Sequence, residues 1–377
     1  MNGIQQKELE KKLKNKHYDI VFIGAGVISI LEAVYQSKLG NSVLIVEKDD
    51  DIGGAWRPID IFGYKNIENA IHYFLHDDIA PNFMEKNLNW ELIQTKNKQR
   101  LFKIKFIDKY IKFPFHNSIG RFLSYLIDPM FLKKDNNIFV KTLDLLKKIY
   151  QESGQASYYV KGGAVEIIKT VKEVLKKSSV KVELNTNIQS IEIDDNHKIV
   201  NLKSDKQSFM CSKLVLTHGA RLPKIKSNKK EYSPVEKFHP RPAVHLLVED
   251  NINTKIDQWI FSNNEIIKYV HDLTKFIDEK DRQPDTKVFV FALHPHIQKS
   301  SDIYINLHNE IIKAGIAGKK SSLKDYHWTD VFLPTLYDKD LNHIKNEFSP
   351  CISFLKTENF SRGIGYQANK WSSRIKV

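Results

Sequence analysis

A glycine-centred unit near the N-terminus constrains the fold of this chain more than any other feature. Residues 19–24 (DIVFIG) form a short run of β-branched and aromatic residues, which is typical of a buried strand. Gly24-Ala-Gly26 follows, and residues 27–39 carry apolar side chains at helical spacing. A second apolar run, 42–46, ends at Glu47. The order of strand, glycine turn, helix, strand and acid predicts a complete dinucleotide-binding unit.

The residues of this unit have distinct physical roles. Gly24 permits a tight turn, and Gly26 lets a pyrophosphate approach the helix N-terminus, where N–H groups and the helix dipole favour negative charge. Ser29 stands where a third glycine is usual, and its small side chain preserves close helix–strand packing. Glu47, 21 residues after Gly26, is placed to accept hydrogen bonds from a ribose 2′-OH and would repel a 2′-phosphate. The unit therefore favours NAD or FAD over NADP.

The segment after Glu47 distinguishes between these two dinucleotides. It reads KDDDIGGAWR, with the pair Gly53-Gly54 six residues past Glu47 and Arg57 at its end. This segment resembles the E-x₅-GG-x-x-R segment of the two-dinucleotide-binding-domain flavoproteins. That superfamily includes the flavin amine oxidases, protoporphyrinogen oxidase, phytoene desaturases and UDP-galactopyranose mutase. The resemblance implies FAD as the cofactor, with the glycine pair close to its pyrophosphate and ribityl chain.

Further segments resemble the same superfamily in the expected order along the chain. They are residues 68–74 (ENAIHYF), 106–115 (FIDKYIKFPF), 159–164 (YVKGGA) with a helical run to Leu175, 182–191 (VELNTNIQSI) and 214–220 (LVLTHGA). The resemblance implies that His72 lies near the isoalloxazine ring, that the backbone at Ile188 holds adenine, and that Gly219 ends a strand returning to the cofactor. In the last quarter of the chain, Gly363 and Gly365 stand in place of the superfamily's Gly-Asp and are expected to open a final helix towards the flavin.

The unit and the resemblance together predict a set of cofactor-binding residues, and they leave His72 as a tentative catalytic residue. No set of His or Cys residues has the spacing of a metal site, so no metal is expected. The predicted FAD-binding residues are Gly24, Ala25, Gly26, Ser29, Glu47, Lys48, Gly53, Gly54, Ala55, Trp56, Arg57, Ile188, Gly219, Gly363 and Gly365.

The predicted fold class is α/β, with a Rossmann-like FAD-binding domain and a second, α+β substrate domain. Cofactor-binding segments recur on both sides of stretches that lack them, which predicts a discontinuous arrangement. The FAD-binding domain is expected to comprise residues 17–75, 156–225 and 345–377, and the substrate domain residues 76–155 and 226–344.

Composition, the length of apolar runs and the cysteine content indicate in which compartment the protein is expected. A hydrophobic content of 41% and a charged content of 27% are ordinary for a globular protein. The longest uncharged apolar run, residues 20–31, is too short to span a bilayer, and the first seventeen residues lack the apolar core of a signal peptide. The two cysteines, Cys211 and Cys351, are expected to be free thiols in a reducing cytoplasm.

The net charge of +13 raises the question of an anionic partner. Lysine is spread along the whole chain and arginine occurs at only eight positions, so a nucleic-acid-binding surface is not expected. The partner expected is a small-molecule substrate, with an anionic one as an option. The aromatic and basic stretch 113–134 also suits a membrane surface, although a buried helix of the substrate domain is the favoured interpretation.

Three functions remain open from the sequence. The first is an amine-oxidase-like, FAD-dependent oxidoreductase whose flavin accepts a hydride from a small organic substrate. The second is a flavoenzyme similar to UDP-galactopyranose mutase that acts on a nucleotide sugar. The third is a non-catalytic flavin-binding protein, which the departures Ser29 and Ala70 and the missing Gly-Asp would accommodate.

Overall fold

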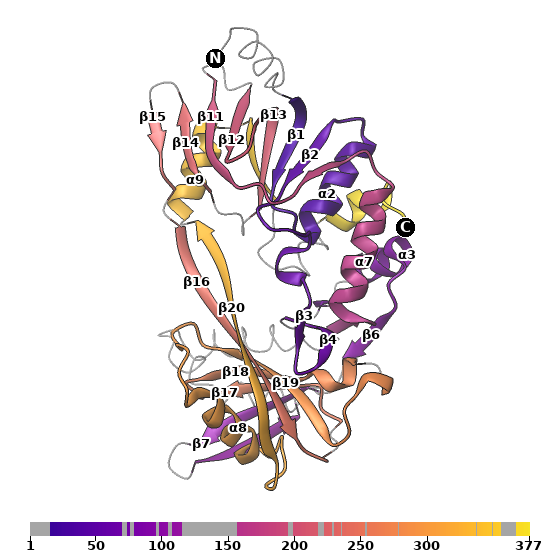
Figure 1. Ribbon diagram of the computed structural model, residues 1–377, viewed down its shortest axis with the longest axis vertical. Helices are drawn as coiled ribbons and strands as arrows, with labels where there is room; N and C mark the ends of the chain where they lie inside the picture. Colours follow the sequence, from indigo (N-terminus) through magenta and orange to yellow (C-terminus); the bar gives the residue numbers. More distant parts are fainter. Residues whose placement is uncertain are drawn as a thin grey trace, which may run out of the picture.

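The protein has two lobes, each built around its own β-sheet (Figure 1). The first lobe contains the glycine-centred unit, and the second lobe is reached through the long strands β16 (Glu236–Glu249) and β20 (Ser322–Leu336). The computed structural model describes residues 16–69, 74–75, 79–95, 98–104, 108–114, 157–194, 199–217, 222–227, 230–234, 236–252, 255–277, 279–336, 338–348, 350–355 and 367–377.

Nine strands of the described residues form the sheet of the first lobe. Five of them run parallel in the order β10-β2-β1-β13-β21, and β12, β11, β14 and β15 continue the sheet beyond β13. The strands are β1 (Lys16–Ile23), β2 (Val43–Val46), β10 (Lys181–Glu183), β11 (Ile188–Ile193), β12 (Val200–Ser204), β13 (Ser208–Thr217), β14 (Lys224–Ser227), β15 (Lys230–Tyr232) and β21 (Ile352–Leu355).

The central parallel strands are continuously apolar at 20–23, 43–46 and 214–216, because both faces of the sheet are covered there. On one face, Phe22 and Ile45 pack under the helices α2 (Val27–Lys38) and α7 (Gly163–Lys176). On the other face, Val21 and Leu44 belong to a second cluster that includes side chains of α9 (Asp338–Phe348). This two-sided burial explains why the predicted strands at 19–24 and 42–46 have no polar alternation. Both strands, and the helices expected after Gly26 and Gly163, are confirmed.

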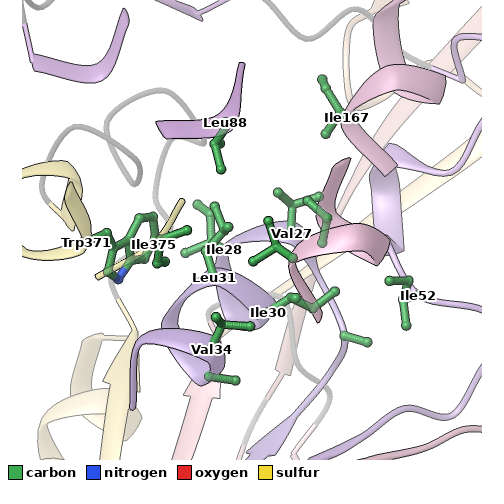
Figure 2. Close-up of a cluster of buried hydrophobic side chains, with 14 of the residues drawn as sticks. Val27, Ile28, Ile30, Leu31, Val34, Ile52, Leu88, Ile167, Trp371 and Ile375 are labelled. Atoms are coloured by element: carbon green, nitrogen blue, oxygen red, sulfur yellow. The ribbon is translucent and has the colours of Figure 1, made fainter. Parts of the chain in front are cut away.

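The C-terminal segment completes the helical layer of the first lobe. Trp371 and Ile375 are fully buried against Ile28 of α2 and Leu88 of α3 (Ile79–Leu88), as Figure 2 shows. Glu32 of α2 anchors this segment in a buried position. Its carboxylate accepts hydrogen bonds from Lys370 Nζ at 2.6 and 2.8 Å and from Trp371 Nε1 at 2.8 Å.

The second lobe is a seven-stranded sheet in the described part of the chain, in the order β20-β16-β19-β18-β17-β7-β8. One face packs on α8 (Ile303–Lys313), and the other packs on the hairpin of β3 and β4. The remaining elements are β3 (Ile59–Ile61), β4 (Tyr64–Ile67), β5 (Phe74–Leu75), β6 (Leu92–Thr95), β7 (Lys98–Ile104), β8 (Lys109–Pro114), β9 (Ser157–Val160), β17 (Gln258–Ser262), β18 (Ile267–Asp272), β19 (Thr286–Leu293) and the 3₁₀ turns η1 (Gly54–Trp56), η2 (Leu273–Phe276) and η3 (Glu279–Asp281).

Three segments predicted for the substrate domain pack with the first lobe instead. Helix α3 contributes Phe83 and Met84 to the core under α2. Strands β14 and β15 extend the first sheet to Tyr232, beyond the expected boundary at 225. Helix α9 begins at Asp338, before the expected boundary at 345, and buries Ile344. Motif positions alone do not show which sheet an intervening segment packs on, so the boundaries shift where packing decides them. The discontinuous division itself remains a prediction.

In the described residues, no helix combines the length and the apolar character required to cross a membrane. Most of the aromatic and basic stretch 113–134 lies outside the described residues.

The Glu32 anchor predicts a specific loss of stability. We expect Glu32→Ala to lower the free energy of unfolding by about 2–3 kcal/mol, mainly because the buried indole N–H of Trp371 loses its acceptor. Lys370 contributes less because its side chain is 37% exposed and can turn to water. Chemical denaturation measures the change, and Glu173→Ala on the exposed face of α7 is the control, with an expected change within about 0.5 kcal/mol. Equal losses in the two variants would contradict the anchoring role.

Candidate functional site

The first glycine turn connects β1 to the start of α2. Gly24 has a φ of 96°, which favours glycine, and its N–H donates to the Val46 carbonyl at 2.8 Å. Gly26 is the N-cap residue of α2 at a φ of −67°, and no described side chain caps the helix there. The first turn of α2 also carries no acidic residue. Its N–H groups therefore present uncompensated positive charge at this end of the sheet.

The second glycine pair packs directly against the first. Gly53 and Gly26 form a parallel β-bridge, and the Gly53 N–H donates to the Ala25 carbonyl at 2.8 Å. Gly54 lies so close that a Cβ on it would be 3.7 Å from the Gly26 Cα. The two motifs, which are separate in the sequence, thus come together in the structure. Their glycines, Gly24, Gly26, Gly53 and Gly54, form one cradle.

The glycines of the cradle are required for different reasons. Gly53 has a φ of 113°, and a Cβ there would collide with Ile168 Cδ1 of α7. A Cβ on Gly26 would meet no described atom within 4 Å. The packing of the protein therefore explains the absence of a side chain at Gly53 but not at Gly26. At Gly26, the open space lies next to the uncapped N-terminus of α2, where an anionic group can approach the backbone.

Glu47 lies at the edge of the cradle, at the end of β2. Its carboxylate is buried, with 6% of the residue exposed, and accepts from the Ala25 N–H at 2.6 Å and from the Asp49 N–H at 3.0 Å. The Thr186 N–H donates to the Glu47 carbonyl at 2.8 Å. The turn that leads to Ile188 is thereby held beside Glu47. The carboxylate retains acceptor capacity, because two oxygens offer about four lone-pair positions.

A junction between the lobes lies at Glu68, directly after β4. The Glu68 carboxylate accepts from the Ala164 N–H at the start of α7 at 2.7 Å, and its carbonyl is 2.8 Å from His245 Nε2 of β16. Burial lowers the pKa of His245 to about 4, so its imidazole is neutral at pH 7. Glu68 was within a segment quoted for the resemblance but was not predicted as a site residue. His245 was missed because a single histidine in a strand gives no local signal of a contact made across two lobes.

A surface hollow of about 650 Å³ is lined by α7 and by the segments on either side of η1. Two of its cations are paired, since Arg57 contacts Asp49 at 3.2 Å and Asp50 at 2.8 Å, and Lys172 contacts Asp51 at 2.6 Å. No group of three or more His, Cys, Asp or Glu side chains suited to a metal ion occurs among the described residues.

Two comparisons of the sequence locate similarity in the first lobe. A family profile described as an NAD(P)-binding Rossmann-like domain matches residues 23–85. An uncharacterized protein in the nifH2 5′ region of Methanosarcina barkeri is 29% identical over 85 residues, which is 22% of this chain. The match spans 44% of the length of that relative.

Solved structures extend the similarity to both lobes. A variant of putrescine oxidase superimposes with a TM-score of 0.63 at 12% identity, over 95% of this chain and 100% of that one. A candidate protoporphyrinogen oxidase from Exiguobacterium gives 0.62 at 13% identity, over 96% and 99%. Reduced UDP-galactopyranose mutase gives 0.64 at 13% identity, over 96% and 95%. The chain shares its fold with these three proteins. The resemblance seen in the sequence is thereby confirmed for the fold class, with a Rossmann-like first lobe and a second lobe.

The predicted binding residues of the superfamily fold occupy different environments in the structure. Ser29 is buried in the first turn of α2, and its hydroxyl has no hydrogen-bond partner among the described residues. Trp56 is a core residue of the first lobe, whereas Lys48 and Ala55 are exposed. Arg57, predicted to contact the pyrophosphate or flavin, is held in the ion pairs described above. The predicted residues His72, Gly219, Gly363 and Gly365 lie outside the described residues.

The contrast within the cradle predicts unequal effects of adding one methyl group. Gly53→Ala is expected to lower the free energy of unfolding by at least about 2 kcal/mol, because it forces a positive φ on alanine and a clash with Ile168. Gly26→Ala, at an ordinary φ with open space around it, is expected to change the free energy of unfolding by less than about 1 kcal/mol, because the lower entropy of the unfolded chain offsets the poorer capping of α2 by alanine. Thermal and urea denaturation of the two variants provide the measurement. A Gly26→Ala variant that is destabilised as much as Gly53→Ala would show that the protein's own packing requires this glycine.

Proposed function

We propose that the protein is an FAD-dependent oxidoreductase of the amine-oxidase-like kind. The observation that supports this most directly is the cradle, in which Gly26 and Gly53 are bridged beside an uncapped helix N-terminus and the buried acid Glu47. A dinucleotide needs this combination, with close backbone approach for a pyrophosphate and a carboxylate for a ribose.

The residues of the first lobe fit FAD. The turn of Gly24, Ala25 and Gly26 would hold the pyrophosphate, and a phosphate would lie where a Gly26 Cβ meets no described atom. Gly26 and the start of α2 would donate to it, because the N–H groups of Gly24 and Ala25 already donate to Val46 and Glu47. Glu47 would hold the adenosine ribose, and the turn before Ile188 would border the adenine. FAD, when bound, supplies the hydride acceptor.

The contribution of the chain to the reaction is binding, orientation and exclusion of water. Trp56 and Ile52 close the apolar side of the cradle, since both are buried in the core of the first lobe. The second lobe would present the substrate to the flavin. We propose a small organic substrate, and an anionic one suits the net charge of +13 because the field of the protein attracts anions.

The first test is the visible absorption spectrum of the purified protein before and after addition of FAD. Bound flavin bands that bleach when a small organic substrate, an amine for instance, is added without oxygen support an oxidoreductase. Flavin bands with no substrate reduction, together with binding of a nucleotide sugar only after dithionite treatment, would favour mutase-like chemistry instead. A protein that neither retains nor binds FAD would overturn the proposal.

Gly26→Ala separates ligand binding from stability. Because its methyl group occupies the space assigned to the pyrophosphate, the variant is expected to bind FAD at least tenfold more weakly, while its unfolding temperature stays within about 4 °C of the wild type. Titration with FAD, followed by quenching of flavin fluorescence, gives the affinity. Wild-type affinity in this folded variant would place the dinucleotide elsewhere.

Glu47→Gln tests the ribose contact with little change of shape. Its amide oxygen can still accept from the Ala25 N–H, whereas its NH2 group cannot accept from the Asp49 N–H. The charge that strengthens a bond from a ribose hydroxyl is lost. We expect FAD affinity to fall about tenfold, equivalent to about 1.4 kcal/mol. The exposed Glu173→Gln serves as the control and should bind FAD as the wild type does. If both variants keep wild-type affinity, Glu47 does not bind the ribose.

A further inference from the structure

His245 lies next to the edge strand of the second sheet, on the face that packs against the hairpin of β3 and β4. It is on β16, between β20 and β19, and it is completely buried. Its neighbours at alternate positions, Ala243 and Leu247, pack with Tyr64 and Ile67 of β4. A histidine at this place is the polar exception on an apolar contact surface, so its hydrogen bonds determine what it contributes there.

The imidazole of His245 makes one hydrogen bond among the described residues, and this bond shows which ring nitrogen carries the proton. Nε2 lies 2.8 Å from the Glu68 carbonyl oxygen, and because a carbonyl can only accept, Nε2 must carry the proton. Nδ1 is buried and has no hydrogen-bond partner among the described residues. The desolvation that lowers the pKa of this histidine keeps the ring neutral, with a bare Nδ1. His245 is therefore a fixed donor that points from the second lobe to the first.

Glu68 carries this contact onward to α7. While its carbonyl accepts from His245, its carboxylate accepts from the Ala164 N–H, which is among the first N–H groups of α7 that lack an acceptor within the helix. Gly163 makes room for the carboxylate, because a Cβ at Gly163 would lie 2.8 Å from Glu68 Oε1. The backbone and the side chain of one residue thus tie the second sheet to the start of α7.

Helix α7 in turn contacts the cradle. Ile168, one turn after Ala164, occupies the space in which a Gly53 side chain would lie. Gly53 is bridged to Gly26 at the start of α2. A continuous set of contacts therefore runs from His245 through Glu68, α7 and Ile168 to the cradle.

We propose that His245 is a positioning residue whose Nε2–H, by holding Glu68, fixes the start of α7 and its contact with the cradle relative to the second lobe. This inference rests on the proposed function in that the cradle is taken as the flavin site. It assigns a role in flavin binding to a residue of the second lobe that does not touch the cradle. The segment that follows Glu68, which includes His72, begins at this fixed point.

Two substitutions of similar polarity separate positioning from bulk packing. Gln places an amide nitrogen as many bonds from the backbone as Nε2, so His245→Gln can still donate to Glu68. Asn places its nitrogen at the level of Nδ1, so His245→Asn cannot reach the Glu68 carbonyl. In flavin-free protein, we expect amide hydrogen exchange at Ala164 to be about tenfold faster in His245→Asn than in His245→Gln. His296→Asn, at an exposed histidine that follows β19, is the control and should exchange as the wild type does.

The flavin provides a readout that general destabilisation does not change. We expect His245→Asn to bind FAD about tenfold more weakly and to shift its absorption bands, with His245→Gln close to wild type in both. A difference at Ala164 with identical FAD affinity and spectrum would make His245 purely structural and would overturn the proposal. Equal exchange at Ala164 in the two variants would also overturn it. Absence of FAD binding by the wild type refutes the proposed function separately, because the exchange measurement needs no flavin.

A measurement on the wild type covers the case in which His245→Asn does not fold. In protein labelled with ¹⁵N-histidine, the nitrogen shifts of His245 should report the Nε2–H tautomer across neutral pH. An Nδ1–H tautomer, or a charged ring at pH 7, would contradict the donor role on which the proposal depends.

Discussion

The contact between two glycine turns is the constraint on which the rest of the structure depends. Gly26 begins α2, Gly53 begins the turn after β2, and a parallel β-bridge joins their backbones directly. Ile168 of α7 leaves no room for a side chain at Gly53, whereas a Cβ at Gly26 would meet no described atom within 4 Å. The sheet, α2 and α7 are therefore positioned about a site that the protein leaves free on one side. Such a site is consistent with a ligand that completes the packing.

The second lobe is connected to the first lobe close to the cradle. The hairpin β3–β4 leaves the first lobe directly after the cradle and buries Tyr64 and Ile67 against the second sheet. At the end of β4, Glu68 then returns to the first lobe through Ala164. The chain thus crosses between the lobes close to the cradle, where we propose that FAD binds. A change in the position of one lobe relative to the other is therefore expected to alter the cradle. Glu68, α7 and Ile168 connect the two, and each is joined to the next by a single hydrogen bond or a close apolar contact.

Two buried carboxylates in the core of the first lobe accept hydrogen bonds from specific donors. Glu32 holds Lys370 and Trp371, and Glu47 holds Ala25 and Asp49. Each buried carboxylate has a specific partner, as the cost of burying an unpaired charge requires. The C-terminal segment is therefore part of the first lobe through an acid on α2, although Gly363 and Gly365, which were predicted to open it, lie outside the described residues.

The sequence by itself determined the first strand, the glycine turn, the helix after it and the acid at Glu47, because these depend on local periodicity and on the freedom of glycine. It also determined the fold class, since the order of motifs is preserved along the chain. Only the tertiary structure decided that α3, β14, β15 and α9 pack with the first lobe, that Arg57 pairs with neighbouring aspartates, and that His245 contacts Glu68. These depend on which surfaces meet after folding. A contact between residues far apart in the chain leaves no trace in the spacing of either one.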